Sequence, residues 1–290
     1  MNVLSYGHWG RPVLVFPSEQ GKAEDFYQNG MVDAVSGLLD SGRVKLYCVD
    51  SYDAQSWSNQ SIPTEERARE HGRYEAWILG EVVPFIHSDC GGAPEIVTLG
   101  CSLGAFHAAN FALKRADLFP LALCFSGNYD PSAWHAWGER GNESYFNNPM
   151  DYVGHLNGDH LGWLRDRISL LLVCGQGQWE DTTGSLDSTR RFAALLEGKQ
   201  IRHELDLWGH DVPHDWPSWR AQLAHHLQRF CLLTGAAYDH APDRDAARDR
   251  GGLAARLRAD TARARPGDRR QRRQACLRHR TDHHRAVQPA

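Results

Sequence analysis

The chain has 290 residues, 41% of them hydrophobic and ten of them tryptophan, which is enough for the core of one large domain or two small ones. The formal net charge of −4 is unevenly divided. Residues 232–290 contain 14 Arg and 7 Asp with neither Lys nor Glu, a balance of +7 that leaves −11 for residues 1–231. This negative charge on residues 1–231, which we expect to fold, argues against a nucleic-acid-binding face there.

The start of the chain lacks the basic segment and continuous apolar segment of a signal peptide. No apolar run approaches the roughly 18 residues needed to span a membrane. The seven cysteines are an odd number, and Cys48, Cys101, Cys124 and Cys174 lie in apolar, strand-like runs. We therefore expect buried thiols in a cytoplasmic protein rather than a disulfide framework, and the absence of C-x-x-C pairs predicts no zinc site.

Short apolar runs alternate with longer amphipathic ones along the body of the chain. After an edge strand within 2–11, we expect in chain order strands at 12–17 and 44–50, a helix at 64–87, a strand at 96–101, a helix at 103–116, strands at 121–126 and 168–174, a helix at 187–198, a strand at 202–208 and a helix at 217–231. Most of these strands are almost continuously hydrophobic, as strands buried on both faces are. The alternation predicts an α/β fold with a mostly parallel sheet flanked by helices, whose reactive groups collect at the carboxyl ends of the strands.

Two segments interrupt this pattern. Residues 127–163 are rich in Asn, Gly, Asp and aromatic residues, and we expect them to form an ordered excursion that serves as a lid or substrate wall. Residues 232–290 contain very few large apolar side chains, so we expect a disordered Arg-rich tail after a domain spanning 1–231.

A serine stands at a predicted strand-to-helix corner. Residues 100–104 read Gly-Cys-Ser-Leu-Gly, which fits the G-x-S-x-G pattern of a nucleophile held on a strained turn. The flanking glycines are needed there because larger side chains would collide with the neighbouring strand and helix. Ser102 is therefore the candidate nucleophile, and a tight packing turn is the alternative.

A serine hydroxyl needs a base to take its proton and an acid to orient that base. In this kind of fold the chain order is serine, acid, histidine. Glu180 and Asp181 follow the 168–174 strand, and His210 and His214 follow the 202–208 strand. Both loops fall at the strand ends where such partners belong.

Several segments resemble the putative esterase family of the α/β-hydrolase superfamily, the group that includes esterase D and the mycobacterial mycolyltransferases. The resemblance covers residues 1 to about 231, is greatest to short bacterial members, and is strongest in "VLVFPSEQG", "GCSLGAFHAANFALKRADLFP", "SGNYD", "GQGQWEDTT" and "HDWPSW". It implies an α/β-hydrolase fold with the base at His214 and the acid at Asp181, while Glu180 and His210 remain the alternatives. Family chains usually begin further upstream, which implies a short or missing first edge strand here.

The oxyanion that forms during attack on an ester needs preorganised donors. We expect one to be the backbone N–H of Leu103. The other should come from the loop after the first central strand, where the sequence does not separate Ser18, Glu19 and Gln20.

Several tryptophans fall in loops at the predicted catalytic end. They could form an aromatic-walled substrate pocket, although core packing explains any one of them equally well. The candidates are Trp134, Trp137, Trp179, Trp216 and Trp219.

The sequence thus predicts a serine hydrolase that cleaves carboxylic esters through an acyl-enzyme, with Ser102, His214 and Asp181 as its triad. We expect no cofactor and no metal. The expected partner is a small-molecule ester, with no nucleic acid and no membrane; the oligomeric state is open and includes a homodimer. The rival hypotheses are an acyltransferase that uses the same triad and a non-catalytic binding protein of the same fold.

Overall fold

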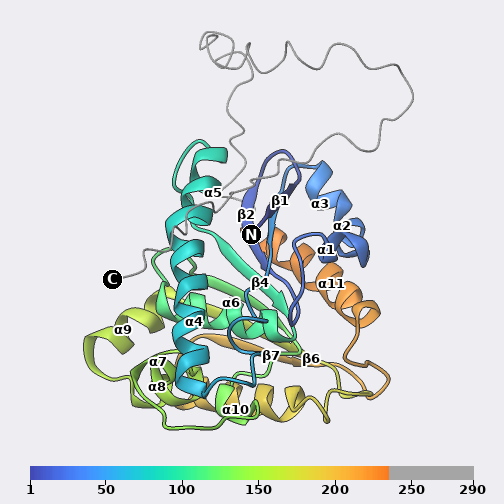
Figure 1. The fold of residues 1–290 in the computed structure, drawn as a ribbon. Helices are drawn as coiled ribbons and strands as arrows, with labels where there is room; N and C mark the ends of the chain where they lie inside the picture. The colour runs from blue at the N-terminus through green and yellow to red at the C-terminus, as the bar shows by residue number, and fades with distance from the viewer. Residues whose placement is uncertain (235–290) are drawn as a thin grey trace, which may run out of the picture.

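A seven-stranded sheet forms the centre of the computed structural model, which describes residues 1–234. Nearly all of the predicted tail, 232–290, lies outside the described residues. The strand order is β1-β3-β2-β4-β5-β6-β7 (Figure 1), and the strands are β1 (Val3–Tyr6), β2 (Arg11–Phe16), β3 (Val44–Val49), β4 (Val97–Cys101), β5 (Leu121–Phe125), β6 (Ser169–Cys174) and β7 (His203–Leu207). Strands β2 to β7 are parallel to one another, and β1 is antiparallel to β3.

The predicted α/β class is confirmed, and each predicted strand is present to within one or two residues. The first edge strand is present but short, as the resemblance implied: β1 has four residues and pairs in register with β3. Because six parallel strands end at the same edge of the sheet, the loops that follow them are brought together there.

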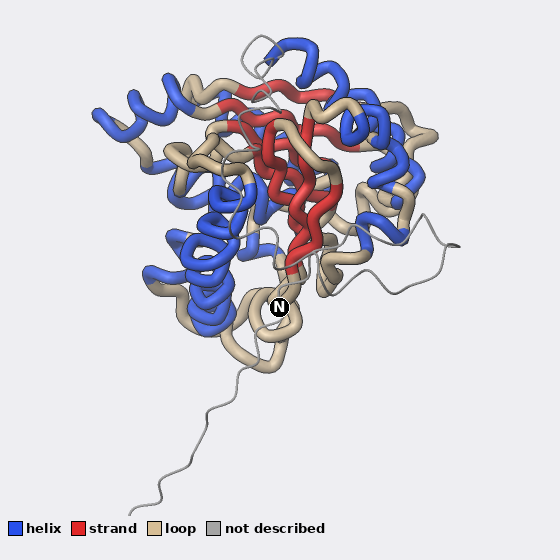
Figure 2. Tube along the Cα trace, turned by 90° about the horizontal axis from the view of Figure 1, so that it is seen from above, coloured by secondary structure: helices blue, strands red, loops and turns tan. Residues whose placement is uncertain are grey.

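Helices cover both faces of the sheet and make three layers (Figure 2). One face is covered by α1 (Asp25–Gln28), α2 (Met31–Ala34), α3 (Ser36–Asp40) and α11 (Trp216–Thr234). The other is covered by α4 (Thr64–Trp77), η1 (Ile78–Val82), α5 (Val83–Asp89), α6 (Leu103–Lys114), α8 (Pro149–His155), α9 (Gly158–Arg167) and α10 (Ser185–Gly198). Within residues 1–234, no helix is both long and apolar enough to cross a membrane.

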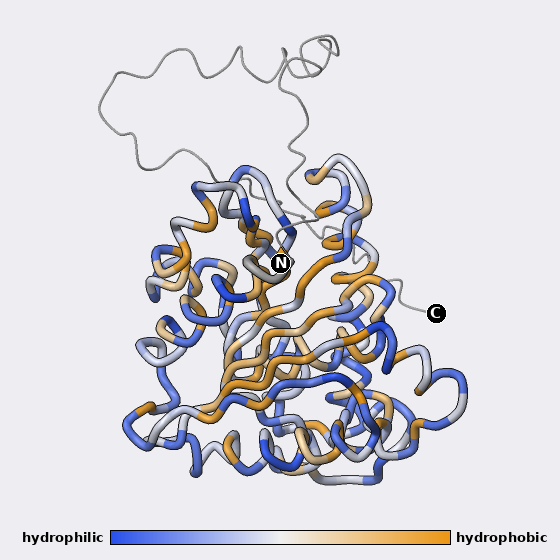
Figure 3. Tube along the Cα trace, turned by 180° about the vertical axis from the view of Figure 1, so that it is seen from behind, coloured by the Kyte–Doolittle hydropathy of each residue, from blue (hydrophilic) through white to orange (hydrophobic). Residues whose placement is uncertain are grey.

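Alternate side chains of each central strand enter two separate cores. In β2, Leu14 and Phe16 pack under α4 and α6, whereas Val13 and Val15 face the layer of α11. Both faces of the sheet are buried, which is why the strand sequences are continuous hydrophobic runs. Figure 3 shows these strands in orange between helices that are partly blue.

The helix predicted over 64–87 is interrupted by a turn of π-helix. It consists of α4, η1 and α5 in immediate succession. Pro84 lies just after the π-helical turn, and proline has no N–H to donate and a ring that crowds the carbonyl four residues earlier. The wider turn accommodates that ring without ending the helix.

The 127–163 excursion is ordered, as predicted, and consists of short helices: η2 (Pro131–Ala133), α7 (Asn142–Phe146), α8 and the start of α9. Its first part is fastened to α4. The buried guanidinium of Arg67 donates to the carbonyls of Ile62, Trp134 and His135 at 2.9–3.1 Å. The bonds to Trp134 and His135 hold the backbone of the excursion against the helix, and the bond to Ile62 ties in the loop before α4.

Replacing Arg67 with Met should destabilise the protein by about 2–4 kcal/mol, because three carbonyls would lose the donor that the buried guanidinium supplies. Arg73, on the same helix, has a side chain that is 71% exposed and pairs with Glu70. Arg73→Met should therefore change the unfolding free energy by less than about 0.5 kcal/mol. Denaturant unfolding of both variants measures the difference, and equal effects would contradict the anchoring role of Arg67.

Candidate active site

Ser102 occupies the corner between β4 and α6 in a conformation that few non-glycine residues adopt. Its φ and ψ are 56° and −122°, and its N–H donates to the Phe125 carbonyl at 2.8 Å. Such a backbone conformation costs about 1–3 kcal/mol of free energy and persists only where the surrounding structure enforces it. The corner lifts the Ser102 hydroxyl away from its own backbone and toward the carboxyl edge of the sheet.

The two glycines of the corner permit the close packing that enforces it. A Cβ at Gly100 would lie 2.0 Å from the Gly104 carbonyl oxygen. A Cβ at Gly104 would lie 2.4 Å from the Pro17 carbonyl oxygen and 2.5 Å from that of Phe16. The pattern seen in the sequence therefore has the predicted steric cause, and it brings the loop after β2 against the start of α6.

His214 lies between Ser102 and a buried carboxylate. Its Nε2 is 3.0 Å from Ser102 Oγ, and its Nδ1 is 2.9 Å from Glu180 Oε2. A carboxylate only accepts, so Nδ1 carries the proton and Nε2 is left to accept from the serine hydroxyl. The imidazole also packs edge-on against Trp219, with ring centroids 5.0 Å apart.

The carboxylate beside His214 is Glu180, not the expected Asp181. Glu180 is 0% exposed and also accepts hydrogen bonds from the Ser126 hydroxyl and the Gly175 N–H. Asp181 is exposed, and its carboxylate accepts from the N–H of the adjacent Thr182. Trp179, the residue before Glu180, has a φ of 71°, so the chain turns sharply just before the two carboxylates; Glu180 is buried there and Asp181 stays exposed.

The loop that carries His214 packs directly on the loop that carries Glu180. The Gly177 N–H donates to the Val212 carbonyl at 2.9 Å, and a Cβ at Gly175 would lie 2.0 Å from that same oxygen. His210, the alternative base, is exposed, whereas His214 Nε2 lies 3.0 Å from Ser102 Oγ. The structure therefore brings His214, and not His210, to Ser102.

Two residues that could supply backbone N–H donors, Leu103 and Glu19, line the cavity beside Ser102. Leu103 is the first residue of α6, so its N–H has no acceptor within the helix. Of the three loop candidates, Glu19 lines the same cavity, whereas Ser18 lines a separate small hollow. The Gln20 N–H is already donated to Asp53 at 3.1 Å, which removes Gln20 from the candidates.

The cavity beside Ser102 has a volume of about 380 Å³. Trp57 and Trp134 form its aromatic walls, and the remaining lining is largely hydroxyl and amide: Ser58, Gln60, Asn128, Thr182, Thr183 and Ser185. Trp57 was not among the predicted pocket residues, although it lies in the segment that follows β3 at the carboxyl edge of the sheet.

The other predicted pocket tryptophans lie elsewhere. Trp137 and Trp179 are 49% and 50% exposed and are not among the residues that line the cavity. Trp216 packs against Trp219, which is buried and donates to the Ser126 hydroxyl. Trp219 thus supports Glu180 and His214 from behind, and of these five tryptophans only Trp134 lines the cavity.

The cysteines offer no rival nucleophile at the corner. Burial raises the pKa of the Cys101 thiol far above its usual range, so the group beside Ser102 stays protonated. Cys48, Cys124 and Cys174 are buried free thiols with pKa values raised for the same reason, as predicted. Residues 1–234 contain no cluster of three His, Cys, Asp or Glu side chains suited to a metal ion.

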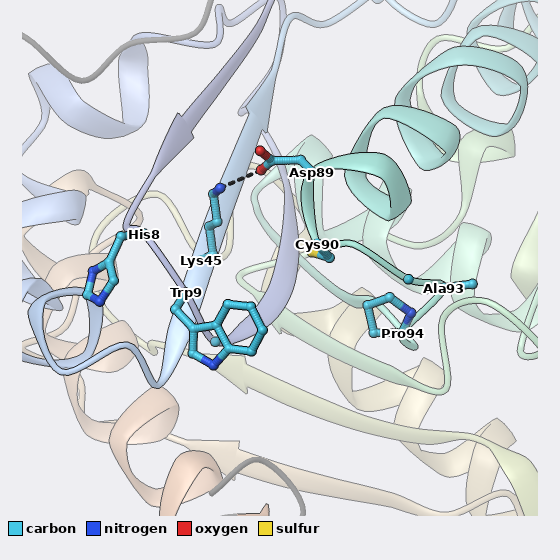
Figure 4. A pocket seen from close by; sticks show the side chains of 9 residues that line it. His8, Trp9, Lys45, Asp89, Cys90, Ala93 and Pro94 are labelled. Atoms are coloured by element: carbon cyan, nitrogen blue, oxygen red, sulfur yellow. Dashed lines mark hydrogen bonds and ion pairs between the residues drawn. The ribbon is translucent and has the colours of Figure 1, made fainter. Parts of the chain in front are cut away.

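A second cavity of about 400 Å³ lies between the β1–β2 turn and the loop before β4 (Figure 4). His8 and Trp9 line one side of it, and Lys45 and Asp89 pair with each other across its wall. Ser102 and His214 are not among its lining residues, so it is distinct from the cavity described above.

A family model described as "Putative esterase" matches residues 12–230. The chain belongs to this family. It is a serine esterase of the α/β-hydrolase fold, as the sequence predicts. Among curated proteins, none matches the sequence.

Solved structures resemble the esterase in fold at low sequence identity. An S-formylglutathione hydrolase from Agrobacterium tumefaciens is 15% identical, with a TM-score of 0.59 over 77% of this chain and 84% of that one. MPT51 (FbpC1) of Mycobacterium tuberculosis is 13% identical, with a TM-score of 0.57 over 79% and 91%. FphF, a fluorophosphonate-binding serine hydrolase of Staphylococcus aureus, is 14% identical, with a TM-score of 0.54 over 77% and 84%. At these identities the likeness shows a shared fold.

Gly104→Ala should destabilise the esterase by about 1–3 kcal/mol or more, because the new methyl group would overlap the Pro17 and Phe16 carbonyls. Gly72, inside α4, faces open space. Gly72→Ala should instead stabilise the protein by about 0.5–1 kcal/mol through helix propensity. Opposite signs in denaturant unfolding are expected; a neutral Gly104→Ala would contradict the tight corner.

Proposed function

We propose that this esterase hydrolyses small carboxylic esters through an acyl-enzyme on Ser102. The observation that carries the proposal is the continuous hydrogen-bonded line from Ser102 Oγ through both nitrogens of His214 to Glu180. Nucleophile, base and orienting acid follow the chain order of α/β-hydrolases. Glutamate in place of aspartate is an accepted variant of the triad.

In the first half-reaction, Ser102 Oγ attacks the ester carbonyl carbon while His214 Nε2 takes the hydroxyl proton. The buried Glu180 carboxylate stabilises the imidazolium that forms. The carbonyl oxygen gains the negative charge and is held by the Leu103 N–H and by the N–H of Glu19. Their donation strengthens as the charge develops, and this lowers the barrier.

The tetrahedral intermediate collapses when the carbon–oxygen bond to the alcohol breaks. His214 returns its proton to the departing alcohol oxygen, and the acyl group remains on Ser102. A water molecule then attacks the acyl carbon and gives its proton to His214. The bond between the acyl carbon and Ser102 Oγ then breaks, His214 gives the proton to Oγ, and the carboxylic acid leaves.

The cavity favours a compact ester with polar substituents. Its volume of about 380 Å³ suits a small molecule, and Trp57 and Trp134 offer flat apolar faces. The hydroxyl and amide groups around them can hydrogen-bond with substrate oxygens. A long unbranched alkyl chain would leave these polar groups unpaired, which costs affinity.

The single-residue test is a kinetic panel with short p-nitrophenyl esters. Ser102→Ala and His214→Ala should each lower kcat/KM by roughly 10³-fold or more, and Glu180→Gln by about 10²- to 10⁴-fold. Asp181→Asn and His210→Ala are the matched controls, and each should stay within about twofold of wild type because both residues are exposed and the bonds of His214 are made with Ser102 and Glu180.

Wild-type activity in Ser102→Ala would refute the proposal. An inactive wild type that also fails to react with a fluorophosphonate at Ser102 would favour a non-catalytic binding protein. Product formation that depends on an added alcohol or sugar acceptor, with little free acid, would indicate acyl transfer by the same residues.

A further inference from the structure

Behind the loop 18–21 lies a buried carboxylate that the reaction does not use. Asp53, in the segment after β3, is 0% exposed. Its Oδ2 accepts the N–H of Gln20 at 3.1 Å, and its Oδ1 is 2.9 Å from His107 Nε2. His107 belongs to α6, the helix that begins directly after Ser102. One side chain therefore links the 18–21 loop to the helix of the nucleophile.

The loop needs such a constraint because its backbone is strained. The Gly21 N–H donates to the Ser18 carbonyl at 2.9 Å, which closes a β-turn with Gln20 as its third residue. Gln20 has a φ of 54°, as the third residue of a type II turn requires, and glycine is the usual residue there. A non-glycine side chain makes this form costly, so the turn would otherwise favour type I.

The two turn types differ by a flip of the central peptide, which here joins Glu19 to Gln20. In the observed form the Gln20 N–H points at the Asp53 carboxylate. A flip would turn the Glu19 carbonyl oxygen toward that negative charge, with loss of the hydrogen bond. The buried carboxylate therefore selects the strained form of the turn.

His107 completes the link from within an aromatic cage. Its ring centroid lies 5.2–5.7 Å from those of four neighbours: Phe16, His71, Tyr74 and Phe106. Burial, with a smaller contribution from His107, lowers the pKa of His71, so the imidazole stacked on His107 is neutral. Asp53 is the hydrogen-bond partner of His107 among residues 1–234, and in such dry surroundings that bond is strong.

We propose that Asp53 and His107 are a positioning pair that holds the 18–21 loop at a fixed place relative to α6. The inference rests on the proposed function, because the distance it sets is that between the two oxyanion donors, Leu103 and Glu19. Neither member of the pair touches substrate. Both act through the backbone of the loop, as supports of a preorganised site do.

The test compares two buried aspartates three positions apart. The Asp50 carboxylate accepts the N–H groups of Asn2 and Ala23, neither of which belongs to α6. Asp53→Asn should lower kcat for p-nitrophenyl acetate by about tenfold to a hundredfold and change KM by less than about twofold, since oxyanion contacts act mainly in the transition state. Asp50→Asn should lower the melting temperature but leave kcat within about twofold.

A boronic acid that mimics the tetrahedral intermediate supplies a second readout. Its inhibition constant should rise in Asp53→Asn by the same factor as kcat/KM falls. His107→Leu, which removes the donor to Asp53, should reproduce this loss, and His107→Gln should rescue part of it through its side-chain amide. Equal kinetic effects of Asp53→Asn and Asp50→Asn, or a change in KM alone, would overturn the positioning role.

Amide hydrogen exchange of residues 18–21 separates this inference from the proposed function and covers variants with too little activity to measure. Exchange should be faster in Asp53→Asn than in Asp50→Asn, and equal rates would overturn the inference. Full activity in Ser102→Ala, by contrast, would refute the proposed reaction, while the exchange result would still decide whether Asp53 holds the loop.

Discussion

The hydrogen bond between the buried Glu180 carboxylate and His214 Nδ1 is the interaction on which the site depends. It fixes the tautomer of the imidazole, and the tautomer decides that Nε2 faces Ser102 as an acceptor. A carboxylate with no exposure must be satisfied from within, and the Ser126 hydroxyl and the Gly175 N–H do so. The Ser126 hydroxyl itself accepts from the indole N–H of Trp219, so the carboxylate lies in a hydrogen-bonded network that is closed to solvent.

Parallel pairing explains why the pieces meet. Ser102, Ser126 and Glu180 each follow a different strand, and His214 lies in the loop after β7. Their strands lie side by side in the order β4-β5-β6-β7, so residues up to 112 positions apart are brought into hydrogen-bond reach. The close contacts are made by backbone, which is why glycine occupies positions 100, 104 and 175.

Two anchors give the other side of the site its shape. Arg67 holds the carbonyls of Trp134 and His135 and thereby sets the aromatic wall of the cavity. Asp53 holds the strained turn at Gln20 and ties it to α6. Both are buried charges whose hydrogen bonds include backbone groups, so they constrain the chain path rather than one side chain. Rigid surroundings of this kind suit a reaction whose transition state needs donors already in place.

The sequence by itself determined the fold class, the strand order along the chain, Ser102 at its corner and the loops that supply acid and base. These follow from hydrophobic periodicity and from local steric rules, which act over a few residues. The tertiary structure alone decided between Glu180 and Asp181, because only the fold shows which of these two adjacent carboxylates is buried beside His214. Packing placed His214, which the family resemblance implied, beside Ser102, brought the unpredicted Trp57 to the cavity, and excluded Gln20 as a donor. All of these outcomes depend on burial and on hydrogen bonds between segments that are distant in the sequence. A local sequence pattern contains no information about such long-range contacts.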